Sequence, residues 1–186
     1  MEQTFMKEKK IIPLVLSMSL PMMLSMLVNS LYNIVDSYFV AQISEQAMTA
    51  LSLVYPLQLL ETAIAVGFGI GINAAAAFYL GAGERKNAND VVTSGTLLSI
   101  VHGIVLTLFS IGFARYFVGM FTDQQPILED AVKYAWIVFA FTIPNVVAIT
   151  FEKIFQAEGR MKVSMISMLC GCVVNIILDP MLIFGI

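Results

Sequence analysis

Apolar residues dominate the chain in long runs that short polar segments interrupt. Four stretches of 18 to 25 residues carry no charged side chain: 11–35, 62–83, 91–114 and 134–151. A helix needs about 20 residues to cross a hydrocarbon core of roughly 30 Å, so each stretch is long enough to span a membrane. The pattern predicts five transmembrane helices, at about 11–41, 47–80, 90–120, 127–156 and 161–186.

The polar segments between these runs contain residues that typically form turns or helix ends. A Gly-Ala-Gly sequence at 81–83 ends one helix ahead of the charged residues 84–87, and Pro126 opens another. Residues 44–46 and 158–160 predict two further tight turns. Because lipid offers no hydrogen-bond partner to an open sheet edge, every span should be a helix. The sequence therefore predicts an all-α polytopic membrane protein.

Composition narrows the function classes. Hydrophobic residues make up 59% of the chain and charged residues 12%, whereas a soluble domain carries about 25% charged residues. The net charge of −3 is small and scattered, which argues against nucleic acid as a partner. Cys170 and Cys172 lie two residues apart in an apolar run and point to different helix faces, so they predict no metal site. Without a His-rich motif or a Ser/His pair at one depth, we expect no enzyme and no cofactor.

Basic residues predict the orientation in the membrane. If residues 1–10 form a cytoplasmic segment, the outer side holds two basic residues, Arg115 and Lys133. The inner side then holds eight: Lys7, Lys9, Lys10, Arg85, Lys86, Lys153, Arg160 and Lys162. We therefore expect a multi-pass protein of the plasma (inner) membrane with a cytoplasmic N-terminus and a transmembrane lobe over 11–186.

The first span carries a polar stripe. Ser25, Asn29, Asn33 and Asp36 recur at spacings of four, four and three, which places them on one helical face. The serine and asparagines are explained well by hydrogen bonds to neighbouring helices. A carboxylate inside a membrane costs several kcal/mol, so Asp36 is the stronger functional candidate.

A second polar pair lies on the fifth span. Asn175 and Asp179 are one turn apart and share a face. A rise of about 1.5 Å per residue puts them, Asp36 and Tyr134 in the same outer half of the membrane. Two carboxylates, an amide and a phenol suit a proton or a hard cation such as Na⁺, or would neutralise a cationic substrate.

Other polar or small residues give weaker signals. Glu61 falls nearer the midplane and does not match this depth, and the isolated His102 is typical of an interhelical hydrogen bond. Gly67, Gly69 and Gly71 predict close helix approach.

In order along the chain, six motifs resemble those of one transporter family. They are Ser-Leu-Pro at 19–21, Tyr-Asn-Ile-Val-Asp-Ser-Tyr-Phe-Val at 32–40, Gly-Ile-Gly-Ile-Asn at 69–73, Leu-Gly-Ala-Gly at 80–83, Gln-Ala-Glu-Gly-Arg at 156–160, and Asn-Ile-Ile-Leu-Asp-Pro-Met-Leu-Ile-Phe-Gly at 175–185. This set resembles the multidrug and toxic compound extrusion (MATE) family, in its bacterial branch of DinF-like and MepA-like exporters.

The resemblance implies a fold and a set of roles. The family has twelve helices in two six-helix lobes around a central cavity, and it exports amphipathic, often cationic drugs against H⁺ or Na⁺. This chain resembles five helices of the first lobe. Asp36, Asn175, Asp179 and Tyr134 match its ion- or proton-binding residues, with transient Na⁺ expected at the first three. Pro21 matches the proline at which the first helix bends.

Further expectations follow for the cavity and the partners. We assign Met26, Tyr32, Asn33 and Glu61 to the substrate cavity. Membrane lipid and small amphipathic cations are the expected partners. The chain ends in an apolar segment at Ile186, which predicts a piece of a longer protein that acts with a missing C-terminal lobe or as a parallel homodimer.

Two alternative functions stay open. A flippase for lipid-linked oligosaccharides should line its cavity with Arg or Lys for pyrophosphate, and no basic residue lies deep in the spans. A non-transporting membrane scaffold would use its polar residues only to hold helices together.

Overall fold

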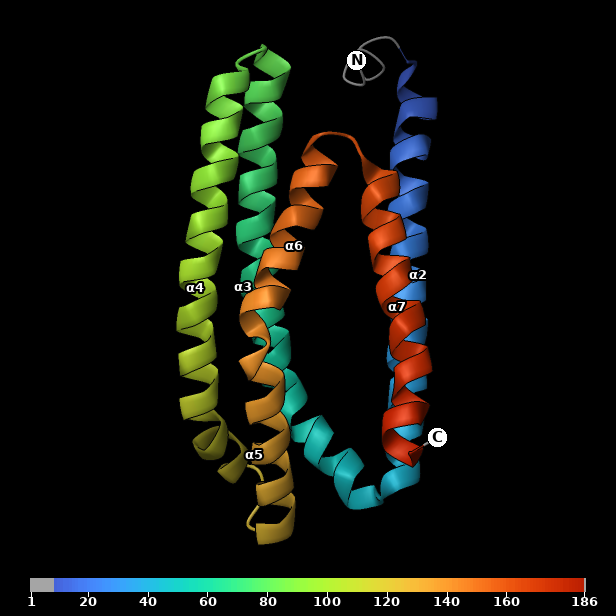
Figure 1. Ribbon diagram of the computed structural model, residues 1–186, viewed down its shortest axis with the longest axis vertical. Coiled ribbons are helices and arrows are strands. Elements are labelled where there is room, and N and C mark those ends of the chain that lie inside the picture. Colours follow the sequence, from blue (N-terminus) through green and yellow to red (C-terminus); the bar gives the residue numbers. More distant parts are fainter. Residues whose placement is uncertain (1–8, 186) are drawn as a thin grey trace. The chain divides into compact units, whose positions relative to one another are not determined.

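The computed structural model describes residues 9–185, and every regular element in that range is a helix (Figure 1). The helices are α2 (Ile11–Ile43), α3 (Glu45–Ala82), α4 (Arg85–Gly119), α5 (Gln125–Ala140), α6 (Thr142–Ala157) and α7 (Met161–Phe184). The predicted all-α class is therefore confirmed. Residues 1–8 of the expected cytoplasmic segment, with Lys7, and Ile186 lie outside the described residues.

Four helices are each long and apolar enough to cross a membrane: α2, α3, α4 and α7. The helices α5 and α6 pass the same test only as a pair, bent by 48° at their junction. Because a bend of 48° leaves the chain travelling in the same general direction, the pair forms one broken span rather than a loop that turns back. The chain is a multi-pass membrane protein with four such helices in the described residues, and with five spans when the bent pair is counted as one.

The uninterrupted helix predicted over 127–156 is corrected by the break at Phe141. Pro144 has no N–H to donate to the carbonyl of Ala140, and its ring crowds the preceding turn. The backbone N–H of Phe141 bonds to Val138 at 3.0 Å, three residues back, which tightens the last turn of α5. The proline thus accounts for the broken ladder of hydrogen bonds.

Two helix starts also differ from the prediction. Ser44 alone separates α2 from α3, and its hydroxyl accepts the backbone N–H of Ala47 at 3.0 Å as an N-cap. The helix α4 begins at Arg85 instead of about residue 90, so most of the expected charged loop is helical. Gly83 makes this possible because it adopts φ +82°, the left-handed conformation that ends α3 within one residue.

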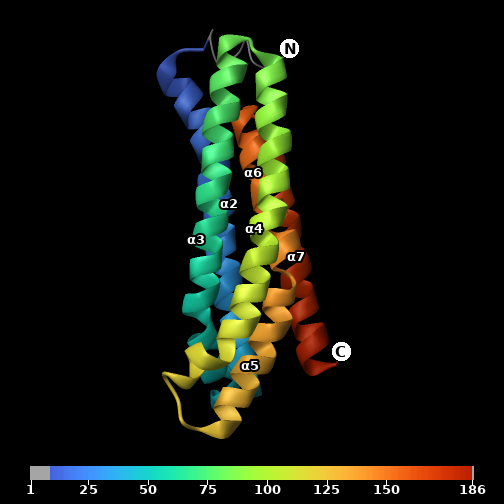
Figure 2. The same ribbon diagram turned by 90° about the vertical axis from the view of Figure 1, so that its left-hand side faces the viewer.

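The chain divides into two compact units, one formed by residues 43–154 and the other by residues 1–42 and 155–186. In the 43–154 unit, α3 and α4 run side by side in both views, with α5 packed on them (Figure 1, Figure 2). Its core is formed by apolar side chains, mostly small or medium-sized, around the fully buried Phe139: Ala50, Val54, Leu57, Ala114, Val118, Leu128, Ala131, Val132, Ala135 and Phe139.

Close helix approach in this unit depends on specific glycines. A Cβ on Gly69 would lie 2.9 Å from Cγ of Lys153, so this part of the glycine prediction is confirmed. Gly67 and Gly71 face open space and do not support it. The tightest approach was not predicted: a Cβ on Gly95 would lie 2.7 Å from Cγ1 of Ile72.

Candidate ion-binding site

The carboxylates of Asp36 on α2 and Asp179 on α7 lie close enough to repel each other. Both helices belong to the unit formed by residues 1–42 and 155–186, and both side chains are half-buried. Two ionised carboxylates that share a site of low dielectric constant destabilise each other. A cation or proton that neutralises one of them removes this repulsion. The structure thus brings together the two acids that the sequence placed at one depth.

Asn175 completes this cluster from α7. Its Nδ2 donates a hydrogen bond to Oδ2 of Asp179 at 3.3 Å. The bond joins residues i and i+4 on one helix face, as the spacing predicts. Together the three residues, which we call the acidic cluster, offer carboxylate and amide oxygens, the ligand types that hard cations prefer.

The polar stripe on α2 makes local hydrogen bonds. Ser25 donates to the carbonyl of Pro21 at 2.8 Å, and Asn33 donates to the carbonyl of Asn29 at 2.7 Å. Both groups are therefore satisfied within their own helix. Helix α2 continues without a break across Pro21, whose role as a hinge stays a prediction.

The cavity residues expected on α2 have different environments. Met26 and Asn33 are exposed, whereas Tyr32 is half-buried. Their contact with a substrate stays a prediction.

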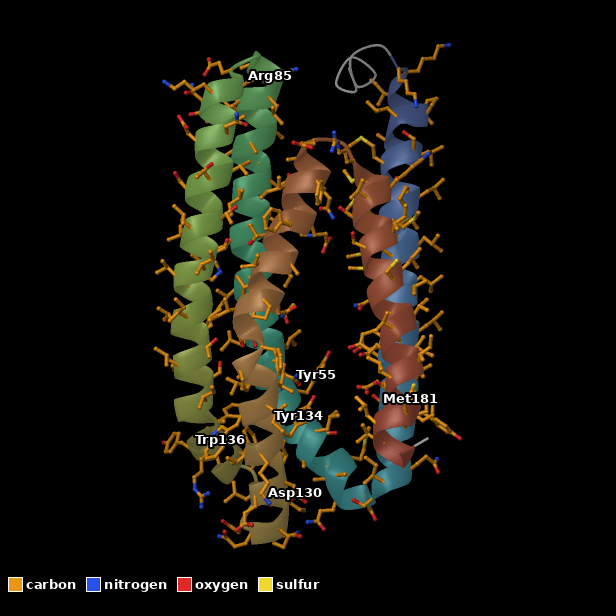
Figure 3. All side chains as sticks on the ribbon, in the orientation of Figure 1. Tyr55, Arg85, Asp130, Tyr134, Trp136 and Met181 are labelled. Carbon is orange, nitrogen blue, oxygen red and sulfur yellow. The ribbon has the colours of Figure 1, made fainter. Side chains whose placement is uncertain are left out.

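Tyr134 and Glu61 belong to the 43–154 unit. The phenol oxygen of Tyr134 accepts a hydrogen bond from Nε2 of Gln58 at 3.5 Å, and Figure 3 shows Tyr134 on α5. Glu61 is only 5% exposed and interacts with the side chains of Thr142 and Asn145. The roles of Tyr134 in the acidic cluster and of Glu61 in a substrate cavity stay predictions.

The sequence reasoning missed Thr142 and Asn145. A signal was present, because Pro144 interrupts an otherwise apolar stretch and polar residues flank it on both sides. Broken helices in membranes are tolerated where protein or a cavity satisfies the freed backbone groups. Polar side chains around such a proline are therefore candidates for a site.

His102 differs from its prediction. Its Nδ1 lies 2.9 Å from the carbonyl of Leu98 in the same helix. The ring stacks on Phe68 of α3, with centroids 4.2 Å apart. The interhelical contact thus exists, but as ring stacking rather than as the expected hydrogen bond.

A half-buried acid pair on two apolar spans of a multi-pass, all-helical protein defines a class of membrane proteins with an intramembrane polar site. The family is shown by sequence: the family model described as MatE matches residues 21–181. The chain belongs to the MatE family, as its motifs predicted.

Curated relatives agree with this assignment. The chain is 29% identical to a protein of Staphylococcus haemolyticus named "Multidrug export protein MepA", over 100% of this chain and 41% of that protein. It is 26% identical to a protein of Shewanella oneidensis named "FAD transporter", over 92% of this chain and 38% of that protein. The chain thus spans about two fifths of the length of these relatives.

Solved structures give the same fold. A crystal structure of a MATE proline-to-alanine mutant matches with a TM-score of 0.92 and 25% identity, over 97% of this chain and 41% of that one. A MATE described as being in the bent conformation matches with a TM-score of 0.87 and 27% identity, over 92% of this chain and 38% of that one. A MATE in the straight conformation matches with a TM-score of 0.85 and 28% identity, over 90% of this chain and 37% of that one.

Proposed function

We propose that this chain is the N-terminal lobe of a secondary antiporter that exports amphipathic, often cationic compounds in exchange for H⁺ or Na⁺. The observation that carries the proposal is the acidic cluster, in which Asp36 of α2 repels Asp179 of α7 and Asn175 bonds to Asp179. Ionisable groups inside membrane spans mark ion and proton pathways by default. A relative named as a multidrug export protein supports export as the direction of transport.

The negative charges of the two carboxylates explain how the acidic cluster could take up and release a cation. When both carboxylates are ionised, Asp36 and Asp179 repel each other. Uptake of a proton or of Na⁺ removes that repulsion and lets the oxygens of Asp36, Asn175 and Asp179 approach a common centre. A cation that binds one conformation better than the other shifts the balance between them, which is the requirement for alternating access.

Bending of α2 at Pro21 is the proposed conformational response. A proline removes one backbone hydrogen bond and makes that turn easier to bend. Solved relatives described as bent and straight support two conformations for the family. In this proposal, cation uptake at Asp36 bends the helix near Pro21 and narrows a cavity lined by Met26, Tyr32 and Asn33.

The proposed setting is the inner membrane with the N-terminus in the cytoplasm, because basic residues concentrate on that side. The relatives are more than twice as long as this chain. We therefore propose that export requires further helices, supplied by a C-terminal lobe or by a second copy of the chain in parallel orientation.

Asp36→Asn in a transporter that contains this lobe and its completing helices is the test of the proposal. We expect export to be abolished in a drug-susceptibility assay, because asparagine cannot take up and release a proton and binds a cation weakly. Asp179→Asn and Asn175→Ala should weaken export severely. Asp90→Asn is the matched control, since Asp90 is an exposed acid on α4.

Expression in the membrane should survive in Asp36→Asn and Asp179→Asn, because removing a partly buried charge lowers a desolvation cost. It should also survive in Asp90→Asn, since Asp90 is exposed, and in Asn175→Ala, since alanine favours the helix. Full drug resistance in the Asp36→Asn strain would contradict the exchange role. Loss of FAD transport without loss of drug resistance would instead point to the cargo named for the Shewanella relative.

A further inference from the structure

A second buried acid lies in the 43–154 unit, outside the acidic cluster. Glu61 sits in the middle of α3 and is 5% exposed. Leu57 and Ala65, one turn away on either side, are buried apolar residues of the same helix face. A charged carboxylate in such surroundings is costly unless a partner neutralises it. In the described part of the chain, no ion pair joins Glu61 to a basic residue.

The groups that interact with Glu61 come from the start of α6. They are the side chains of Thr142 and Asn145. Thr142 is 1% exposed, and across residues 9–185 its Oγ1 makes no hydrogen bond of regular geometry. A buried hydroxyl without a regular partner is rare, because leaving it unsatisfied costs about 1–3 kcal/mol in the folded state. The group that this hydroxyl faces is the carboxylate of Glu61, so the two buried polar groups interact with each other.

The break between α5 and α6 adds a further acceptor in this region. Residue 144 is a proline, so the carbonyl of Ala140 lacks the N–H that a continuous helix would supply. Interrupted membrane helices with freed carbonyls are recurring cation and proton sites in transporters. Asn145, which interacts with Glu61, is exposed.

We propose that Glu61, Thr142 and Asn145 form a proton-binding site of their own, in addition to the acidic cluster. A proton suits these groups because a protonated carboxyl needs only one acceptor, and Thr142 Oγ1 provides it. When Glu61 is ionised, the same hydroxyl rotates and donates to the carboxylate. The pair is therefore satisfied in both protonation states, which is what a group that loads and unloads a proton requires.

Other titratable groups lie on the helices that pack around Glu61. On α4, Nδ1 of His102 lies 2.9 Å from the carbonyl of Leu98 and the ring stacks on Phe68, whereas its buried Nε2 has no hydrogen-bond partner among the described residues. On α5, the phenol of Tyr134 accepts from Gln58. On α6, Nζ of Lys153 pairs with Oε1 of Glu152 at 3.1 Å. Lys133 on α5 is exposed.

Infrared difference spectroscopy on the full 186-residue chain in lipid vesicles tests this site. Lowering the pH from mildly alkaline to mildly acidic should produce a carbonyl-stretch band of a protonated carboxylic acid. Glu61→Gln should lack one such band, whereas Glu129→Gln, which changes an exposed acid on α5, should retain it. The band should persist in Asp36→Asn, so its presence does not depend on the proposed exchange cluster.

Thr142→Val provides a second, near-isosteric variant if Glu61→Gln does not fold. It should keep the band and move it to higher frequency, because the acid loses a hydrogen-bond acceptor. Identical spectra for Glu61→Gln and the unmodified chain would overturn the site, and an unmoved band in Thr142→Val would remove Thr142 from it. A Glu61-dependent band that disappears when NaCl replaces choline chloride at constant pH would overturn the assignment to a proton in favour of Na⁺.

Discussion

The hydroxyl of Thr150 on α6 donates a hydrogen bond to the hydroxyl of Ser99 on α4 at 2.8 Å, and both side chains are completely buried. Ser99 in turn donates to the carbonyl of Gly95 at 2.9 Å. The two bonds form a short chain that ends on the backbone of α4. Thr150 Oγ1 also lies 2.9 Å from the carbonyl of Val146, so the hydroxyl can donate to this acceptor in its own helix instead. Interhelical bonds of this kind hold membrane helices together where the hydrophobic effect between them is absent.

Thr150→Val and Ser99→Ala should each destabilise the protein by about 1 kcal/mol, the scale measured for interhelical hydrogen bonds in membranes. The double variant should lose less than the sum, because both changes remove the same bond. Denaturant titration in detergent micelles measures the free energies. Thr107→Val is the control, since its hydroxyl bonds only within α4. Strict additivity of the two changes would show that the bond contributes nothing.

Gly95→Ala should destabilise the 43–154 unit by about 1–3 kcal/mol, the usual cost of overpacking. The added methyl would meet Cγ1 of Ile72 at 2.7 Å. Gly112→Ala on the same helix adds its methyl to open space and should be neutral or stabilising. Thermal unfolding compares the two variants.

Removing the opposing side chain gives an independent check on that contact. Ile72→Ala should rescue part of the Gly95→Ala loss, because the obstructing atoms are gone. No rescue would mean that the methyl meets a different obstacle.

Two reporter fusions test the orientation. A reporter fused after Lys86, between α3 and most of α4, should behave as cytoplasmic, and one fused after Gln125 should behave as external. Alkaline phosphatase, which is active only outside the cytoplasm, and a fluorescent protein that matures inside it give opposite signals at each position. The reverse pattern would overturn the orientation.

Pro144→Ala should straighten the broken span, because residue 144 regains an N–H for the carbonyl of Ala140. Each half is 16 residues long, or about 24 Å, and the bend is 48°. Straightening therefore lengthens the span by about 4 Å. Spin labels at Gln125 and Ala157 measure this distance, in a background with both cysteines replaced by alanine. An unchanged distance would assign the bend to the surrounding packing instead of the proline.

The sequence predicted the spans well because the bilayer imposes two simple requirements on them. A span must be long enough to cross the hydrocarbon core, and it must contain few charged residues. It also predicted the proximity of Asp36 and Asp179. Ionisable side chains inside a membrane face the interior of the helix bundle instead of lipid, so two carboxylates at similar depths tend to lie near each other. The i, i+4 bond from Asn175 to Asp179 follows from helix geometry alone.

The contacts between neighbouring helices could not be predicted in the same way. Ser99, Thr150 and Thr142 contact other helices through faces that differ little in hydrophobicity from the rest of each helix. A helix that is apolar on all sides carries no periodic signal for its rotation. The break at Phe141 was missed because prolines are frequent in membrane helices, so Pro144 alone did not distinguish a bend from a continuous span.

The division of the fourth span has a consequence for biosynthesis. Neither α5 nor α6, at 16 residues each and about 24 Å, reaches across a hydrocarbon layer of roughly 30 Å. When α5 leaves the ribosome it is too short to be released into the lipid as a stable span. The insertion machinery must therefore hold it until α6 follows, and the two halves enter the bilayer as one unit. A nascent chain paused when α5 but not α6 has left the ribosome should remain accessible to cross-linking with the translocation channel, unlike chains paused when α2, α3 or α4 has just emerged.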